Sequence, residues 1–169
     1  MSILTKQEIL KEIKRGNIIV SPFKEESVGP ASIDLTLDNK FRIFKQFQDI
    51  VEVDGSADYK AITELIETES ILIKPQETIL GITREKITLA PNICGWLEGR
   101  SRFARLGLLV HISASFMQPG IDNHQVLEIS NVGNVLLRLH AGIKICQFIF
   151  QKTIGKAKYE GQFINQTKP

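Results

Sequence analysis

Cysteine and long apolar runs are scarce in this chain of 169 residues, and each scarcity excludes a class of protein. The two cysteines, Cys94 and Cys146, lie in separate strand-like segments, so a disulfide-stabilised secreted scaffold is excluded and both are expected to be core thiols. No apolar run approaches membrane length, and no signal-peptide pattern is present. These absences predict a reduced, cytoplasmic protein without a membrane partner.

The chain also lacks an excess of charge of either sign. Charged residues make up 24% of the sequence and the formal net charge is +2, which is ordinary for a globular protein. Bulk charge therefore gives no nucleic-acid footprint, and no nucleic-acid partner is expected. The length corresponds to one domain, expected to span residues 1–169, and it is sufficient to bury a core without staples.

Metal-binding spacings are missing as well. The three histidines, His111, His124 and His140, combine with neither cysteine in a zinc-site pattern. The H-x-E and P-C-x-x-C pattern of zinc nucleobase deaminases is absent, because no histidine has a glutamate two residues further on. No protein-bound metal is expected.

The first segment carries a helix-start signature. Thr5 stands as an N-cap with Glu8 three residues later, and Leu4 is placed to pack on Ile9. Gly16 supplies the left-handed residue that ends a helix reaching to about residue 15. The pattern predicts a short packing helix without a chemical role.

Most of the remaining chain is typical of short strands. Apolar alternation and turn residues predict strands at 18–20, 32–37, 41–44, 70–74, 78–83, 86–88, 93–97, 109–113, 126–131, 135–139 and 144–150. So many short strands favour a closed or double-sheet all-β architecture. Residues 45–69 fit either a surface excursion or a short helix and are left unassigned. The polar tail, residues 155–169, is either a disordered end or an arm that orders over something.

A basic turn follows the strand at 93–97. Ser101 can cap a short turn over 102–106, which would direct free backbone N–H groups toward an anion, and Arg100 and Arg102 flank it. Arginine makes bidentate contacts with phosphate, so a polyphosphate clamp is one hypothesis. The other is a solvated turn whose arginines pair with acids such as Glu98. Arg105 could instead point inward.

Glu128 is an acid inside an apolar strand, between Leu127 and Ile129. On alternation it shares a face with Val126, and a carboxylate among apolar groups is costly unless it is paired. Pairing with Arg105 would remove that cost. A partly buried glutamate can serve as a general base, whereas an exposed strand glutamate would carry no chemistry; the pattern leaves both open.

Several motifs together resemble the dCTP deaminase family within the trimeric dUTPase-like superfamily. They are GWLEGRS at 95–101, ARLGL at 104–108, VH at 110–111, PG at 119–120, VLE at 126–128 and Asn131. The segments PASIDLTL at 30–37 and NKF at 39–41, the opening helix at 4–16 and KYEGQ at 158–162 extend the resemblance to both ends. It covers nearly the whole chain apart from residues 45–69.

The resemblance implies a mainly β fold, a distorted β-barrel or jelly roll with a short N-terminal helix, that assembles as a homotrimer with active sites between subunits. It implies that Glu128 activates water for attack at the pyrimidine C4 carbon, with Arg105 orienting both, and that no zinc is used. Ser101 and Ala114 join these two in the catalytic set. The residues expected to bind the nucleotide and its Mg²⁺-bridged triphosphate are Arg100, Ser101, Arg102, Ser113, Ala114, Gln118, Val126, Lys158, Tyr159 and Gln162, with 155–169 as a mobile closing arm.

Departures from the family pattern leave the activity open. Arg102 stands where a second serine is usual, and Gln118 replaces an aspartate that activates water in dUTPases. Asn123 replaces a glycine and Ile121 an aromatic residue. The first prediction is hydrolytic deamination of dCTP to dUTP and ammonia, which supplies dUTP for dTTP synthesis. The alternatives are a dUTP diphosphatase, a bifunctional enzyme, or a nucleotide-binding trimer without catalysis.

Overall fold

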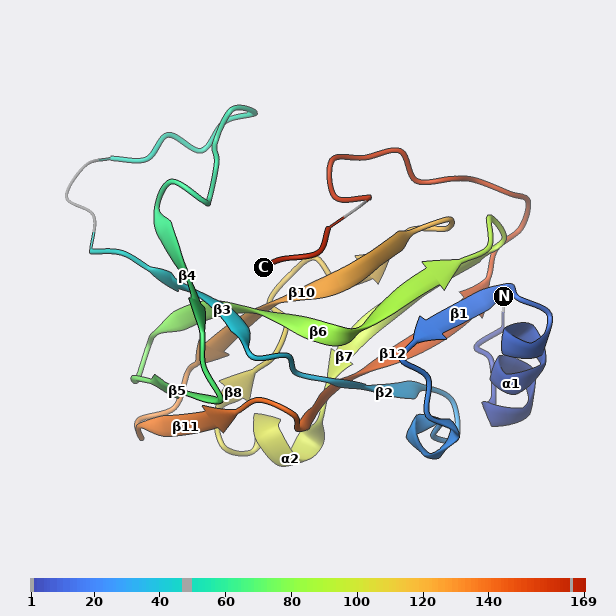
Figure 1. Ribbon diagram of the computed structural model, residues 1–169, viewed down its shortest axis with the longest axis horizontal. Helices are drawn as coiled ribbons and strands as arrows, with labels where there is room; N and C mark the ends of the chain where they lie inside the picture. The colour runs from blue at the N-terminus through green and yellow to red at the C-terminus, as the bar shows by residue number, and fades with distance from the viewer. Residues whose placement is uncertain (1, 47–49, 165) are drawn as a thin grey trace.

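The computed structural model describes residues 2–46, 50–164 and 166–169, and it is mainly β (Figure 1). Its elements in chain order are α1 Lys6–Lys14, β1 Ile18–Ser21, the 3₁₀ turn Glu25–Ser27, β2 Ile33–Thr36, β3 Lys40–Phe44, β4 Thr63–Glu67, β5 Ser70–Ile73, β6 Thr78–Leu89, β7 Ile93–Gly99, α2 Ser101–Ala104, β8 Leu108–Leu109, β9 Phe116–Met117, β10 Asp122–Asn131, β11 Leu137–His140 and β12 Lys144–Lys152. No helix in the described part is long and apolar enough to cross a membrane.

Three antiparallel sheets build the molecule. The largest has the order β4-β3-β6-β10-β8, and β1 also pairs with β6. The second has the order β2-β12-β7-β9, and β11 pairs with β5 in the third. Inward side chains of the two larger sheets form one core, with Leu35, Phe41, Ile87, Leu127 and Phe148 fully buried. This confirms the all-β prediction.

The strand alternation explains both the core and the pocket described below. Residues 33–36 and most of β10 alternate between buried and partly exposed positions, so each of these strands sends one face to the core. Both cysteines are buried free thiols, as expected.

Several element boundaries differ from the prediction. β6 is one strand where two were expected, because Glu85 at the predicted break is buried and accepts the backbone N–H of Thr36 at 2.7 Å. The unassigned stretch contains β4, which pairs with β3. The strand expected at 109–113 is wrong beyond Leu109, because residues 110–115 leave the sheet and turn toward the pocket.

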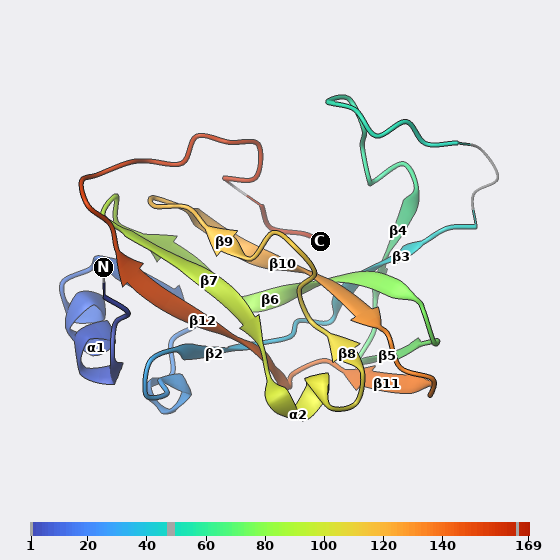
Figure 2. The ribbon, with the colours of Figure 1, turned by 180° about the vertical axis from the view of Figure 1, so that it is seen from behind.

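Helix α1 begins after Thr5 and lies beside the ends of β1 and β12 (Figures 1 and 2). The predicted capping box does not form: Thr5 makes no side-chain capping bond, and Glu8 accepts from Lys11 instead. Gly16 has φ +73°, as the predicted helix end requires.

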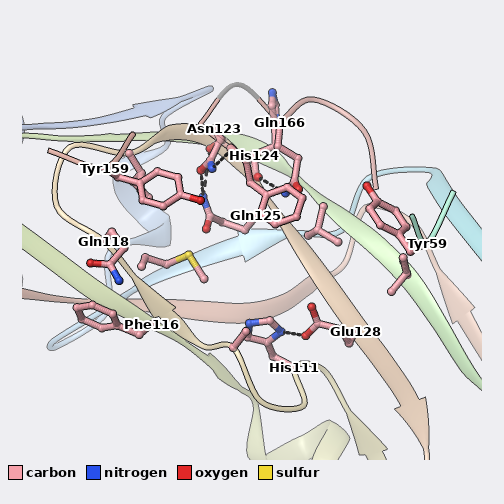
Figure 3. A pocket seen from close by; sticks show the side chains of 16 residues that line it. Tyr59, His111, Phe116, Gln118, Asn123, His124, Gln125, Glu128, Tyr159 and Gln166 are labelled. Atoms are coloured by element: carbon pink, nitrogen blue, oxygen red, sulfur yellow. Dashed lines mark hydrogen bonds and ion pairs between the residues drawn. The ribbon is translucent and has the colours of Figure 1, made fainter. Parts of the chain in front are cut away.

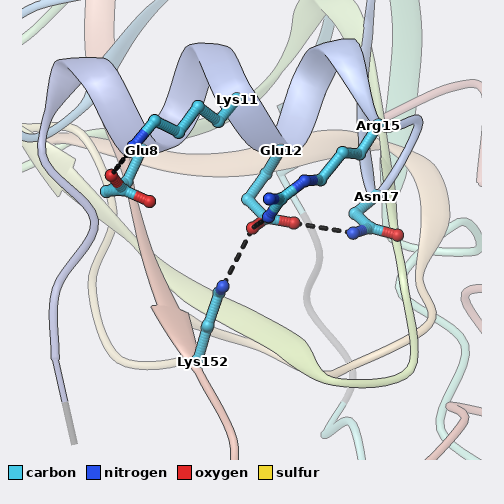
Figure 4. A network of polar contacts seen from close by, with 6 residues as sticks. All are labelled: Glu8, Lys11, Glu12, Arg15, Asn17 and Lys152. Carbon is cyan, nitrogen blue, oxygen red and sulfur yellow. Dashed lines mark hydrogen bonds and ion pairs between the residues drawn. The ribbon is translucent and has the colours of Figure 1, made fainter.

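The inner face of α1 carries an unexpected polar cluster, shown in Figure 4. The Glu12 side chain is 1% exposed and accepts from Asn17 Nδ2 at 2.6 Å, Lys152 Nζ at 2.8 Å and Arg15 at 3.0 Å. The Lys152 hydrogen bond is the main reason that the pKa of Glu12 lies below its ordinary value, against the opposing effect of burial. The cluster fastens α1 to the end of β12.

Candidate active site

A pocket of about 420 Å³ opens on the β10 side of the molecule (Figure 3). Its wall includes residues 123–126 and Glu128 of β10, the irregular segment around residues 111–118 and part of the C-terminal segment. Tyr59, from the excursion between β3 and β4, lines the end near Glu128. Leu80 of β6 also lines it, so the pocket is assembled from parts of the chain that are far apart in the sequence.

The acid of the pocket is Glu128, and it makes an ion pair with Nδ1 of His111. The His111 side chain is only 4% exposed and that of Glu128 is 33% exposed. Figure 3 shows the other imidazole nitrogen turned away from Glu128 toward the side where Phe116 and Gln118 lie. No hydrogen bond from the described residues reaches that nitrogen, Nε2.

The ion pair shifts the pKa values of both groups. Burial alone would lower the pKa of His111, but the hydrogen bond and charge of Glu128 outweigh it, so this pKa is raised. Burial raises the pKa of Glu128, yet the hydrogen bond and charge of His111 prevail, so it lies below its ordinary value. Around neutral pH Glu128 is therefore an ionised carboxylate, able to accept a proton.

The opposite end of the pocket is lined by amides. Gln125 donates through Nε2 to the backbone oxygen of Asn123 at 3.1 Å and to its Oδ1 at 2.9 Å. Asn123 donates through Nδ2 to the backbone oxygen of Phe163 at 2.7 Å. This chain of hydrogen bonds joins β10 to the C-terminal segment.

The C-terminal segment lies over the pocket of its own chain (Figure 3). The backbone N–H of Tyr159 donates to Pro119 O at 2.9 Å, and that of His124 donates to Gln166 O at 3.1 Å. Further along, Arg42 Nε donates to Pro169 O at 2.6 Å. That the segment is a mobile closing arm stays a prediction.

The basic turn lies elsewhere in the chain. α2 is far from β9 and the pocket end of β10 in Figure 2, and no residue of 100–105 lines the pocket. Arg100, not Ser101, is the N-cap residue, because its extended backbone already offers its carbonyl to Phe103 N and Ala104 N. Arg100 pairs with Asp34 at 2.8 Å rather than with Glu98.

The pairing of Glu128 with Arg105 is wrong within one chain. Arg105 is exposed at the end of α2, and the partner of Glu128 is His111. The other expected site residues divide into two groups. Ala114, Gln118, Val126, Glu128 and Tyr159 line the pocket, whereas Arg100, Ser101, Arg102, Arg105, Ser113, Lys158 and Gln162 do not.

Sequence reasoning missed His111, Gln125 and Tyr59. The only signal for His111 was its place beside Val110 in a family motif, which gave it no role. Gln125 falls where simple alternation assigns a core position, and Tyr59 lies in the stretch that the patterns could not assign. Among the described residues, no three His, Cys, Asp or Glu side chains are grouped so that they could hold a metal ion.

The antiparallel sheets and the short N-terminal helix define a β-sheet protein with a pocket that holds an ionised carboxylate. The solved structure of 2′-deoxycytidine 5′-triphosphate deaminase from Agrobacterium tumefaciens has this fold, with a TM-score of 0.68 at 16% identity, over 88% of this chain and 48% of that one. A model of the dCTP deaminase-like family matches residues 3–153, and the chain belongs to that family.

Curated relatives support the same assignment. A protein of Nocardioides sp. named "dCTP deaminase, dUMP-forming" is 35% identical over 99% of this chain and 92% of its own length. Another of the same name, from Mycolicibacterium vanbaalenii, is 37% identical over 93% of this chain and 84% of its own length. The C-terminal segment beyond residue 153 lies outside the family match.

Proposed function

We propose that the protein deaminates dCTP hydrolytically, with a water molecule activated by Glu128. The observation that carries the proposal is an ionised carboxylate in a nucleotide-sized pocket, held by a buried histidine. Glu128 takes a proton from water as the oxygen bonds to C4 of cytosine, and passes that proton to N3 of the ring. It then carries the proton of the new hydroxyl group to the amino group, and the C4–N bond breaks to release ammonia and leave a C4 carbonyl, so dCTP and water give dUTP and ammonia. This chemistry assigns the activation of water to a side chain and not to zinc.

His111 acts through Glu128. Its Nδ1 occupies one carboxylate oxygen, Oε2, and thereby leaves Oε1 for the water. The same contact lowers the pKa of Glu128 and keeps it ionised before the substrate arrives. Magnesium enters with the substrate, bound through the oxygens of the triphosphate.

A second step, hydrolysis of dUTP to dUMP and pyrophosphate, is favoured by the name of the relatives, which are called dUMP-forming. Gln118 lines the pocket in place of the aspartate that the family resemblance leads one to expect. The assay is direct: ammonia, pyrophosphate and the nucleotide product are measured after incubation with dCTP. Ammonia with dUTP indicates deamination alone, ammonia with dUMP and pyrophosphate indicates both steps, and no ammonia refutes the deaminase.

The catalytic base is tested by Glu128→Gln. This variant should lose ~10²–10⁴-fold in ammonia release, because a general base contributes about that much, while nucleotide binding stays within about tenfold. Near wild-type turnover would remove Glu128 from the mechanism.

We further propose that the protein forms a homotrimer and that each active site contains residues of two chains. The pocket has no arginine turn of its own, and Arg102 and Arg105 are exposed at the far end of the molecule. Beside them lies an apolar surface, Leu106, Leu109, Ile112, Val132, Val135 and Leu136, each side chain 40–60% exposed. Val132 N donates to Gly107 O, so these two segments adjoin. A second copy of the chain would cover this surface and bring the turn to a neighbour's pocket.

Mixed trimers test this arrangement. Glu128→Gln and Arg105→Ala should each be inactive alone. After dissociation and reassociation together, about a quarter of the sites would combine an intact Glu128 with an intact Arg105 from the adjacent chain, and that share of activity should return. A mixture that stays inactive would place both residues in one chain's site.

A further inference from the structure

Gln125 stands at an irregularity of β10. The pairing of β10 with β6 shifts register between His124 and Val126, which leaves Gln125 without a partner across the strands. Its backbone N–H instead donates to Thr83 Oγ1 at 2.9 Å. The extra residues of this irregularity, 83–85, lie on β6, so Gln125 keeps its place on the buried face of β10. It lines the pocket together with Val126 although it is only 2% exposed.

The orientation of the Gln125 amide follows from its partners. The backbone oxygen of Phe163 can only accept, so Asn123 must present Nδ2 to it and Oδ1 to Gln125. The backbone oxygen of Asn123 can also only accept. Both contacts therefore require the Gln125 –NH₂ group on that side, which leaves its carbonyl oxygen, Oε1, on the other.

Oε1 of Gln125 faces the pocket. Figure 3 shows it turned away from Asn123, toward the interior of the cavity. In the described part of the chain no hydrogen bond is made to Oε1, and the neighbours of this wall include the apolar Met117 and Ile121. An acceptor that faces the pocket and has no donor from the protein can accept a hydrogen bond from a ligand that brings one.

We propose that Gln125 is a specificity-determining residue, whose oriented carbonyl oxygen accepts a hydrogen bond from an N–H or O–H group of the bound deoxynucleotide. The inference rests on the proposed function for the identity of the ligand. A deoxycytidine nucleotide offers two such donors that near relatives lack: the 4-amino group, absent from uracil, and the 3′-hydroxyl. A pocket that expects a donor discriminates strongly against an analogue without it, because its own acceptor is then left unpaired.

The test is the binding of three nucleotides to the full-length protein. Calorimetry with magnesium present measures dCTP, dUTP and 2′,3′-dideoxycytidine triphosphate, in a Glu128→Gln background that prevents turnover. Gln125→Met keeps the length of the side chain and removes the acceptor. We expect it to reduce the preference for dCTP over one of the two analogues by about three- to tenfold, the equivalent of one neutral hydrogen bond. Loss against dUTP identifies the amino group, and loss against the dideoxynucleotide identifies the 3′-hydroxyl.

A second variant distinguishes a specificity role of Gln125 from a folding defect. Asn123→Ala retains the glutamine and removes one of the two acceptors that orient it, so the same preference should fall by a smaller factor. Gln7→Met, on the exposed side of α1, is the control for a glutamine-to-methionine change. If Gln125→Met weakens all three nucleotides equally, or none, the specificity role is wrong. Binding preferences need no turnover, so a protein that releases no ammonia would refute the deaminase without deciding this inference.

Discussion

Replacing His111 by glutamine should move the acid limb of the pH profile upward. In the wild type the histidine holds the pKa of Glu128 below its ordinary 4.5, although burial acts in the opposite direction. Glutamine removes the charge of the histidine and leaves the burial, so the pKa of Glu128 should rise. A nearby opposite charge lowers a carboxyl pKa, so losing it should shift the acid limb to higher pH.

The assay is kcat/KM for ammonia release from dCTP against pH, because this parameter reports the ionisations of the free enzyme. As the pH falls, His111→Gln should lose activity at a higher pH than the wild type. His140→Gln is a matched control, since His140 is exposed on β11 and does not line the pocket. An unchanged acid limb in His111→Gln would refute the coupling of the two residues.

Stability gives an independent reading of the same pair. The pKa of His111 is raised, so its contribution is complete below the ordinary value of 6.5 and is lost as pH rises through the raised one. The pKa of Glu128 is lowered, so its contribution is present above 4.5 and is lost as pH falls through the lowered one. The difference in melting temperature between the wild type and His111→Gln should therefore be largest between pH 4.5 and 6.5. A difference that is constant with pH would indicate lost packing alone.

Two further predictions concern the ends of the chain. Glu12→Ala should destabilise the fold by ~1–3 kcal/mol, because Asn17 and Lys152 lose their acceptor at a buried position, and thermal melting should show this loss while Glu8→Ala on the exposed side of α1 leaves the transition unchanged. A chain ending at Thr153 should keep its fold but melt at a lower temperature, since it loses the hydrogen bonds that join residues 157–169 to the strands and loops around the pocket. It should lose most dCTP turnover because the pocket loses Tyr159, Phe163 and Gln166. Normal turnover by the truncated chain would make the segment dispensable.

The strands were predictable where one face is buried, because alternation then appears in the sequence itself. β2 and most of β10 follow this rule. In β10 the rule places Glu128 on the partly exposed face, the face on which an acid can line a pocket. The sequence predicts two strands in place of β6, because the charged residues Arg84 and Glu85 interrupt the apolar pattern. Burial of Glu85 depends on the backbone of Thr36, 49 residues away, which no local pattern contains.

The pocket was predictable only in part, for the same reason. Gln125 lies on the buried face of β10, and its backbone N–H donates to Thr83 Oγ1 on the neighbouring strand, where the pairing shifts register. Local sequence spacing tests His111 only as a metal ligand, whereas its partner is the carboxylate of Glu128, 17 residues further along the chain. Contacts of this kind are set by the register between strands, and the register is not visible in either segment by itself.

The structure of a single chain does not bring the basic turn to the pocket. The spacing of this turn was compatible with a phosphate clamp or with a solvated turn paired to an acid, and the structure supplies one acid, Asp34, for Arg100 alone. Arg102 and Arg105 remain exposed next to an apolar surface that water covers at a cost. Solvent-exposed leucine and valine side chains beside two arginines are unfavourable in an isolated chain. Such residues are expected on a surface that contacts another copy of the chain. In the homotrimer proposed above, the basic turn of one chain would meet the pocket of the next, so the assembly, and not the fold of one chain, would complete the site.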